Sequence, residues 1–388
     1  MQKKLIALAL AGLSSAAFAQ TNVTIYGVGD LSLESVKMDG TATSATDAPS
    51  KMRVANNSSY IGFKGTEDLG NGLKAVFQLE TAVSFGTNAD TLGGTGAHAP
   101  AAANFGAARD SYLGLAGDFG TVAIGTLTGP YRALGVLVTN APGAASAAYT
   151  GAVTGTIGGV RTSSDDRTSN MVAYISPNFN GFQVTLGYAA DANSNNAANN
   201  SLSGRTWTLG ANYAAGGLTL GYAYLNSQDP QNAAAAALNG VAGPYNDKLT
   251  GHRLAAKYDF GQGTTLAGMY DRQKWEASNM MGAGYLQRNA WQIALAHRFG
   301  ANTVGLEYAR AAKLNSNAGD VPSSNLSQWS LQYTYDLSKR TMLKAYYTAL
   351  TTGSAVGAGF YNNPVAGSGA FALNGDSRAL GFGMRHSF

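Results

Sequence analysis

The amino-acid sequence predicts an all-β protein, a transmembrane antiparallel β-barrel of about sixteen strands. Three observations support this: a basic and apolar leader, about sixteen segments of alternating apolar and polar residues, and a last segment that ends in phenylalanine. The composition agrees, since the 388 residues include 50 Gly and 20 Tyr but only 9 Pro, and 12% are charged. Such values suit many twisted strands with aromatic ends better than helices.

Residues 1–19 have the features of a secretory signal peptide. Lys3 and Lys4 supply its charge, residues 5–13 an apolar core, and residues 17–19 a small-residue cleavage site. The core is too short for a membrane-spanning helix, and no longer apolar stretch follows it. The formal net charge of +4 falls to +2 without these two lysines, which favours no nucleic-acid partner. No linker divides the remainder, so residues 20–388 are expected to form one barrel domain.

The mature sequence repeats one pattern, in which alternating segments of roughly ten residues are joined by short turns on one side and long loops on the other. Three short glycine-containing turns are clear, at 178–181, 214–217 and 260–263. An even number of strands is typical of a single-chain bacterial barrel. The expected strands are 22–36, 51–66, 72–84, 108–116, 119–127, 166–176, 182–190, 203–213, 218–226, 248–259, 264–275, 286–299, 302–312, 326–336, 340–350 and 376–388.

The placement of charge indicates that one face of these strands meets lipid. A Lys or Arg on the lipid face costs roughly 2–4 kcal/mol at the bilayer midplane, so that face must be nearly free of charge. In 291–299 the register of Trp291 is uncharged, whereas Arg298 lies on the other register. The exception is 264–275, where Arg272 and Lys274 share the outward register, and we interpret them as lying beyond the bilayer. The alternative, a soluble β-sandwich, would turn a polar face outward.

The C-terminal segment has the same alternation and ends in an aromatic residue. Leu380, Phe382, Met384 and Phe388 share one face, while polar residues such as Arg385 occupy the other. This is the pattern of a lipid-exposed strand with an interfacial anchor.

Five stretches occur in an informative order along the chain. They are 23–27 (VTIYG), 59–75 (SYIGFKGTEDLGNGLKA), 109–115 (RDSYLGL), 176–181 (SPNFNG) and the terminal Phe388. With these stretches the chain resembles the general diffusion porins of Gram-negative bacteria, especially the β-proteobacterial type. The resemblance implies an outer-membrane homotrimer in contact with lipid and lipopolysaccharide, and a C-terminal strand that the barrel-assembly machinery reads. It also implies a third external loop that folds inward, with no cofactor.

A barrel of this size also predicts a channel on physical grounds. About sixteen strands enclose a lumen too wide for side chains to fill, so small hydrophilic solutes can pass and only a loop can narrow it. The segment 128–164 is the longest non-strand stretch of the first half and is rich in Gly, Ala and Thr. Small residues suit backbone packed against a barrel wall. The alternative is an external loop that does not enter the lumen.

The charges expected at the constriction follow from the resemblance, which implies wall arginines that face acidic residues on the inward loop. Arg109 and Arg167 match two wall arginines, whereas Tyr60 and Thr126 stand where the pattern has arginine. The expected constriction residues are Arg109, Arg167, Arg132, Arg161, Tyr60, Lys64 and Lys74.

The loop itself carries positive charge only. No Asp or Glu lies between Asp118 and Asp165, and we therefore expect its arginines and those of the wall to be unopposed by acidic loop residues. The sequence predicts a weak to moderate preference for anions. The alternative for each of these charges is a solvated position far from the narrowest section.

Enzymatic functions have little support. The four histidines are scattered, and there is no nucleophile elbow, phosphate-binding loop or metal-binding spacing. We therefore predict a passive channel and no enzyme. The alternatives are a channel selective for a sugar or an oxyanion and, less favoured, a barrel hydrolase or an adhesion scaffold.

Overall fold

The computed structural model describes residues 22–41, 47–83, 85, 109–143, 146–190, 204–228, 248–276, 284–361, 365 and 373–388. The expected signal peptide lies outside the described residues. The strands of the main sheet are β1 (Asn22–Asp39), β2 (Ala48–Asn56), β3 (Tyr60–Gly70), β4 (Leu73–Ala82), β5 (Ser111–Gly117), β6 (Gly120–Thr128), β9 (Arg167–Ile175), β10 (Phe182–Ala190), β11 (Arg205–Ala215), β12 (Leu218–Gln228), β13 (Lys248–Asp259), β14 (Thr264–Glu276), β15 (Tyr285–Phe299), β16 (Asn302–Ala311), β17 (Asn315–Ser316), β18 (Gly319–Asp320), β19 (Leu326–Asp336), β20 (Thr341–Thr352) and β21 (Asp376–Ser387).

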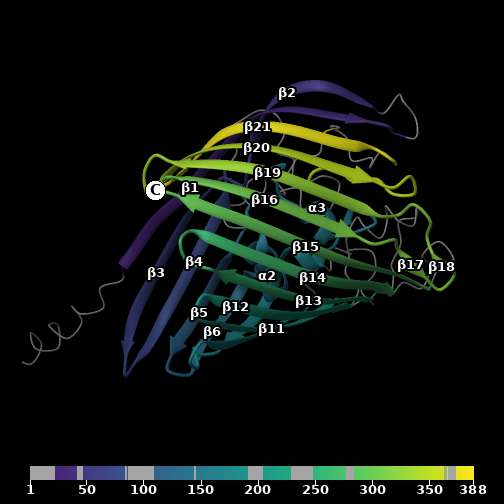
Figure 1. Ribbon diagram of the computed structural model, residues 1–388. Coiled ribbons are helices and arrows are strands. Elements are labelled where there is room, and N and C mark those ends of the chain that lie inside the picture. The colour runs from purple at the N-terminus through teal and green to yellow at the C-terminus, as the bar shows by residue number, and fades with distance from the viewer. Residues whose placement is uncertain are drawn as a thin grey trace, which may run out of the picture.

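These strands form a closed antiparallel barrel, as predicted (Figure 1). Each strand pairs with its neighbours in the chain, and β21 pairs with β1 from Val28 opposite Ser387 to Asp39 opposite Asp376. The barrel has sixteen strands because β2 and β3 together form one of them, and β17 and β18 are a short hairpin that extends the edge of β15. In the part of the chain that the structure describes, no helix is both long and apolar enough to cross a membrane.

The expected single strand 51–66 is interrupted. Leu31 pairs with Asn56 and Val28 pairs with Tyr60. Three steps along β1 therefore correspond to four steps along the second strand, and the extra residue makes a β-bulge. Ser58 takes a positive φ of 68° there. The bulge reverses which alternate residues face inward, and a pattern of period two cannot show such a shift. The other expected strands agree with the observed ones to within a few residues.

The two ends of the barrel differ as expected. The short turns have left-handed backbone where the sequence supplies Gly or Asn, as at Asn180 (φ 51°) and Gly181 (φ 95°). The described connections 129–166 and 312–325 lie at the opposite end. In a bacterial barrel of this kind the short turns face the periplasm and the long loops face outside.

The alternation predicted for the barrel wall is also confirmed. Large apolar side chains such as Leu113 (71% exposed) and Ile124 point outward along the strands. Arg272 and Lys274 share this outward register with Leu266 and Tyr270, and they lie toward the long-loop end of β14. The opposite register, which faces the lumen, holds most of the buried polar and charged residues.

The chain terminus completes the closure of the barrel. Gly27 and Phe388 exchange two backbone hydrogen bonds, each 3.1 Å long. The Phe388 ring covers Gly27 so closely that a Cβ there would lie 2.4 Å from the ring, so glycine is required. That the assembly machinery reads this terminal aromatic stays a prediction.

Candidate pore constriction

The loop between β6 and β9 lies inside the barrel, as predicted, and the alternative of an external loop is wrong. It contains α2 (Pro130–Val138), α3 (Gly151–Thr154), β7 (Thr156–Ile157), β8 (Val160–Arg161) and the 3-10 turn η3 (Ser163–Asp165). Helix α2 packs against β11 to β14, and α3 packs against β15, β16 and β19. Figure 1 shows both helices within the ring of strands.

Glycines on the inner wall make room for α2. Gly221 on β12 faces Leu134, and Gly251 on β13 faces Tyr131. A Cβ at these two positions would lie 2.3 Å and 2.7 Å from the facing side chains, well inside normal contact. A larger residue at either position would force the facing side chain of α2 to shift.

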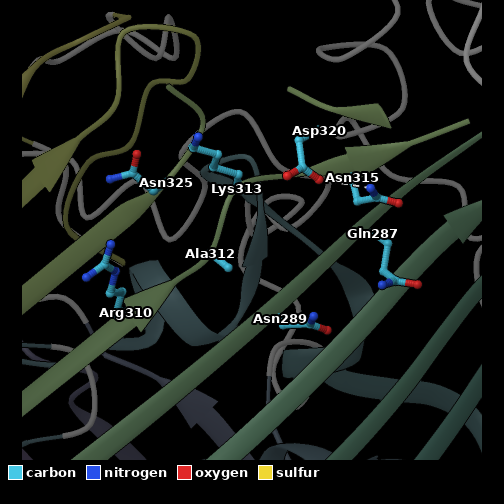
Figure 2. A pocket seen from close by; sticks show the side chains of 8 residues that line it. All are labelled: Gln287, Asn289, Arg310, Ala312, Lys313, Asn315, Asp320 and Asn325. Atoms are coloured by element: carbon cyan, nitrogen blue, oxygen red, sulfur yellow. Dashed lines mark hydrogen bonds between the residues drawn. The ribbon is translucent and has the colours of Figure 1, made fainter. Parts of the chain in front are cut away.

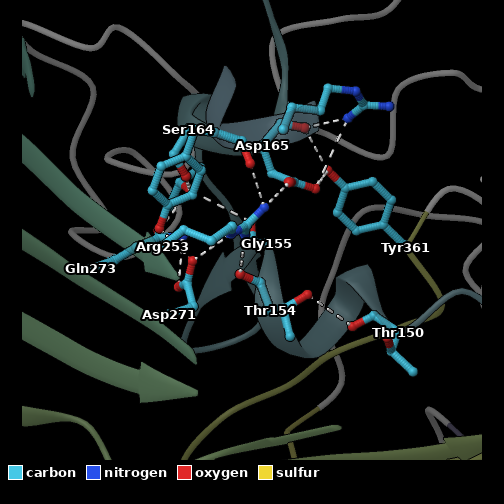
Figure 3. A network of polar contacts seen from close by, with 12 residues as sticks. Thr150, Thr154, Gly155, Ser164, Asp165, Arg253, Asp271, Gln273 and Tyr361 are labelled. Carbon is cyan, nitrogen blue, oxygen red and sulfur yellow. Dashed lines mark hydrogen bonds and ion pairs between the residues drawn. The ribbon is translucent and has the colours of Figure 1, made fainter. Parts of the chain in front are cut away.

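A buried ionic network holds α2 and η3 to the wall (Figure 3). Arg253 on β13 donates from Nε to Asp271 at 2.8 Å and from Nη1 to Asp165 on the loop at 2.9 Å. Asp271 on β14 also accepts hydrogen bonds from the Tyr131 hydroxyl and from Arg288 on β15. The two arginines and the two aspartates neutralise one another. Buried charges require such neutralisation.

A second anchor lies on β16. The buried carboxylate of Glu307 accepts hydrogen bonds from the backbone N of Asn140 (2.8 Å) and from the hydroxyls of Thr139 (3.0 Å) and Thr150 (2.5 Å). Gln292 on β15 donates to the same group at 3.0 Å. The loop is thus fixed at both helices through one wall residue.

The loop continues along β19 and β20. Gln328 and Ser330 donate to the carbonyls of Ala147 and Ala148, at 2.9 Å and 2.8 Å. Lys344, whose ammonium pairs with Asp30 on β1, also donates to a loop carbonyl. The loop therefore covers the wall from β11 round to β20.

The open part of the lumen lies across from this covered wall. The lumen-facing residues in the middle of β12 to β20 are largely buried beneath the loop, whereas those of β3 to β5, apart from Gly62 and Glu80, remain partly or fully accessible. Accessible examples are Tyr60, Lys64, Gln78 and Tyr112. We infer that the constriction is the gap between the loop and the wall from β3 to β5.

The open wall carries two arginine pairs. Arg109 donates to Glu80 at 3.0 Å, and its guanidinium lies 4.1 Å from the centre of the Tyr60 ring. Arg167 donates to Asp110 at 2.9 Å. Burial alone would raise the pKa of Asp110, but Arg167 and hydrogen bonds from Thr128 hold it below its usual value. Burial and the charge of Arg167 lower the pKa of Arg109, so the two guanidinium groups influence each other.

These arginines have acidic partners, although none of the partners lies in the segment 128–164. Glu80 and Asp110 of the wall neutralise Arg109 and Arg167, and Arg132 on α2 binds the carbonyl of Asp165 with the Asp165 carboxylate 4.0 Å away. The acidic partners come from the wall and from Asp165, just after the acid-free segment 128–164.

The other expected site residues are Lys64, Lys74 and Arg161, and Thr126 is the second position where the family pattern has arginine. Lys64 faces the lumen 5.0 Å from the centre of the Tyr26 ring, beside the open wall. Lys74 shares the lumen register but lies at the short-turn end of β4, six residues or roughly 20 Å along the strand from Glu80. The side chain of Arg161 lies outside the described residues. Thr126 hydrogen-bonds Ser169 and takes no part in the arginine pairs.

Sequence reasoning missed the residues that hold the loop. They are charged groups in the middle of strands and on the inward register: Arg253, Asp271, Arg288 and Glu307. A charge in such a position needs a partner inside the lumen, and this signal was available in the sequence. The sequence does not reveal which residue is the partner, because the contacts join residues more than a hundred positions apart.

Known proteins with similar sequences belong to one family. The sequence matches the model of the Gram-negative porin family over residues 6–355. It is 32% identical to the major outer membrane protein P.IB of Neisseria gonorrhoeae, over 88% of this chain and 91% of that protein. It is 30% identical to outer membrane porin protein 32 of Delftia acidovorans over the whole of both chains.

Solved structures show the same fold. An anion-selective porin from Comamonas acidovorans has a TM-score of 0.71 at 24% identity and covers 95% of this chain and 100% of that one. The trimer form of OmpT from Vibrio cholerae has a TM-score of 0.61 at 14% identity and covers 95% of this chain and 99% of that one.

Proposed function

Because this chain belongs to the Gram-negative porin family, we propose that it is a passive channel for small hydrophilic solutes and ions with a modest preference for anions. Porins are non-enzymatic channels of the outer membrane, and this chain is one of them. The open gap beside the loop suits passage of hydrated solutes, since its accessible wall is polar.

One observation carries the preference for anions. In four ion pairs of the lumen the cation is the more accessible partner, because the carboxylate is buried against the wall or the loop, whereas Arg167 and Asp110 are exposed to a similar extent (16% and 19%). The pairs are Arg385 with Asp30, Arg53 with Glu34, Arg109 with Glu80 and Arg132 with Asp165. Their arginine side chains are 12–33% exposed, whereas the carboxylates are at most 7% exposed. A passing ion therefore meets more positive than negative charge, to which Lys64 adds.

Screening of the pore charges by salt limits the size of the preference for anions. Charges exposed to water are screened over about 8–10 Å at physiological salt, and each arginine also has a carboxylate close behind it. We therefore infer a weak preference that strengthens as salt falls. The anion selectivity stated for the porin from Comamonas acidovorans supports the same sign.

Under a potassium chloride gradient, we expect the zero-current potential across a planar bilayer to favour chloride. The double variant with Arg109→Gln and Arg167→Gln should have a zero-current potential shifted toward potassium, because the two replaced cations line the proposed constriction. The control is the pair Lys74→Gln and Arg298→Gln, which removes the same charge from the lumen register at the short-turn end and should leave the potential unchanged.

A wild-type channel that prefers potassium would disprove the assignment. Current that saturates with one solute, a sugar or an oxyanion, would instead support a substrate-selective channel. Folding of each variant is checked by its heat-modifiable migration on a gel.

We also propose a homotrimer that associates through β1 to β6. The outward registers of these strands carry aliphatic residues and Phe but no Trp or Tyr, in contrast to β10 to β20. Interfacial Trp and Tyr mark surfaces that meet lipid headgroups, so their absence indicates a sector covered by protein. OmpT of Vibrio cholerae has a trimer form with this fold. The mass of the purified protein in detergent distinguishes three copies from one.

A further inference from the structure

A short segment after β20, residues 353–361, packs onto the loop between β6 and β9. Its side chains Val356 and Phe360 are at most 6% exposed, and they join the apolar cluster that contains side chains of α2 and α3. The two backbones also meet, because a Cβ on Gly159 of the loop would lie 2.0 Å from the carbonyl oxygen of Gly357. Two connections from distant parts of the sequence are therefore in direct contact.

Tyr361, at the end of this segment, reaches a buried carboxylate of the loop (Figure 3). Its hydroxyl lies 2.7 Å from Oδ2 of Asp165 and 2.9 Å from the carbonyl oxygen of the same residue, and it donates a hydrogen bond there. Its ring packs edge-on against that of Tyr149, with ring centres 5.2 Å apart. The Tyr149 hydroxyl is 3.5 Å from the same Oδ2, which is too long for a strong hydrogen bond. Of the two hydroxyls, that of Tyr361 holds the carboxylate.

Asp165 divides its oxygens between two arginines. Oδ1 accepts a hydrogen bond from Arg253 at 2.9 Å. Oδ2 lies 4.0 Å from Nη1 of Arg132, and that nitrogen donates to the carbonyl of Asp165. The Tyr361 hydroxyl therefore contacts the same two oxygens that face Arg132. The Arg132 side chain is 12% exposed, whereas Asp165 is 1% exposed.

We propose that Tyr361 is a positioning residue of the channel, which keeps the Asp165 carboxylate from closing a direct ion pair with Arg132. Without the hydroxyl, Oδ2 loses a donor inside a buried site, and Arg132, which is 4.0 Å away, can take its place. A direct charge-assisted pair would neutralise the guanidinium more completely than the present separation does. The inference rests on the proposed preference for anions, to which Arg132 contributes.

The test measures the ratio of chloride to potassium permeability of the full protein in planar bilayers, from the zero-current potential. We expect Tyr361→Phe, which keeps the ring and removes the hydroxyl, to lower this ratio by part of the loss that Arg132→Gln causes. In the Arg132→Gln background, Tyr361→Phe should cause no further loss, because the cation on which it acts is gone. A merely structural role of Tyr361 would not make its effect depend on Arg132.

Two controls match these variants. Tyr149→Phe removes a hydroxyl that is 3.5 Å from the same carboxylate oxygen, and it should leave the ratio unchanged. Arg310→Gln removes a cation near the long-loop end, but Arg310 lines a cavity of about 600 Å³ on the outer face of the barrel and should not affect the lumen (Figure 2). Heat-modifiable migration shows whether each variant folds.

The outcomes separate this inference from the proposed function. An unchanged ratio in Tyr361→Phe beside a lower ratio in Arg132→Gln would overturn the inference and leave the anion preference standing. An equal loss in Tyr149→Phe, or the same loss from Tyr361→Phe in both backgrounds, would overturn it as well. A wild type without anion preference, in which Arg132→Gln has no effect, would contradict the proposed function and the inference with it.

Discussion

Replacing residues 131–164 by a short Gly-Ser turn is expected to raise the single-channel conductance by about twofold or more, because the narrowest section of a wet pore limits its current. The design is feasible because Thr128 and Arg167, which flank the loop, are already paired in the β6–β9 ladder. Removing the loop uncovers the wall from β11 to β20 and leaves only the barrel's own width.

The same variant should admit larger sugars in liposome swelling, since the limiting cross-section becomes that of the lumen. Heat-modifiable migration shows whether the variant still folds as a barrel. Conductance and sugar permeation that both stay at wild-type values in a folded variant would mean that the loop does not define the constriction.

Asp271→Asn is expected to lower the stability of the protein strongly, because Asp271 is the shared partner of Arg253 and Arg288. Breaking a fully buried ion pair by removing one partner costs about 3–5 kcal/mol. The matched control is Asp336→Asn, which breaks the pair with Arg298 at the exposed short-turn end. Exposed pairs of this kind contribute about 0–1 kcal/mol.

The measurement is denaturant unfolding of both variants in lipid bilayers or detergent, combined with limited proteolysis of the loop. We expect Asp271→Asn to unfold at lower denaturant and to be cleaved faster within the loop. Equal unfolding midpoints and equal cleavage for the two variants would show that the buried network does not hold the loop to the wall.

The barrel was predictable from the sequence because lipid and water impose a local rule. Outward residues within the bilayer must be nearly free of charge, so the alternation around Trp291 and Leu380 reveals the strand and its inward face without any knowledge of neighbours. The rule fails where an extra residue shifts the alternation of inward and outward side chains, as at the bulge near Ser58. The predicted inward loop is confirmed, although its composition allowed an external loop as well.

The constriction was only partly predictable. That Arg109 and Arg167 form the constriction stays a prediction, and their partners Glu80 on β4 and Asp110 before β5 lie 29 and 57 positions away in the sequence. Whether an arginine is opposed depends on such long-range contacts, which charge counting within one loop does not reveal. Glu307 shows the same point, because it binds residues more than 150 positions away.

The central claim is that the loop covers one side of the lumen and leaves the wall from β3 to β5 open. The chain has no Cys, so single cysteines can be placed on the two sides with little perturbation. Ala82 on β4 and Ala309 on β16 both face the lumen, but Ala82 is partly accessible while Ala309 is fully buried.

The most direct test is the rate at which a charged, membrane-impermeant thiol reagent modifies Ala82→Cys and Ala309→Cys in open channels. We expect Ala82→Cys to react quickly, with a drop in conductance, and Ala309→Cys to react far more slowly without one. If Ala309→Cys reacts as fast as Ala82→Cys and blocks the current equally, the loop does not cover that wall and the account is wrong.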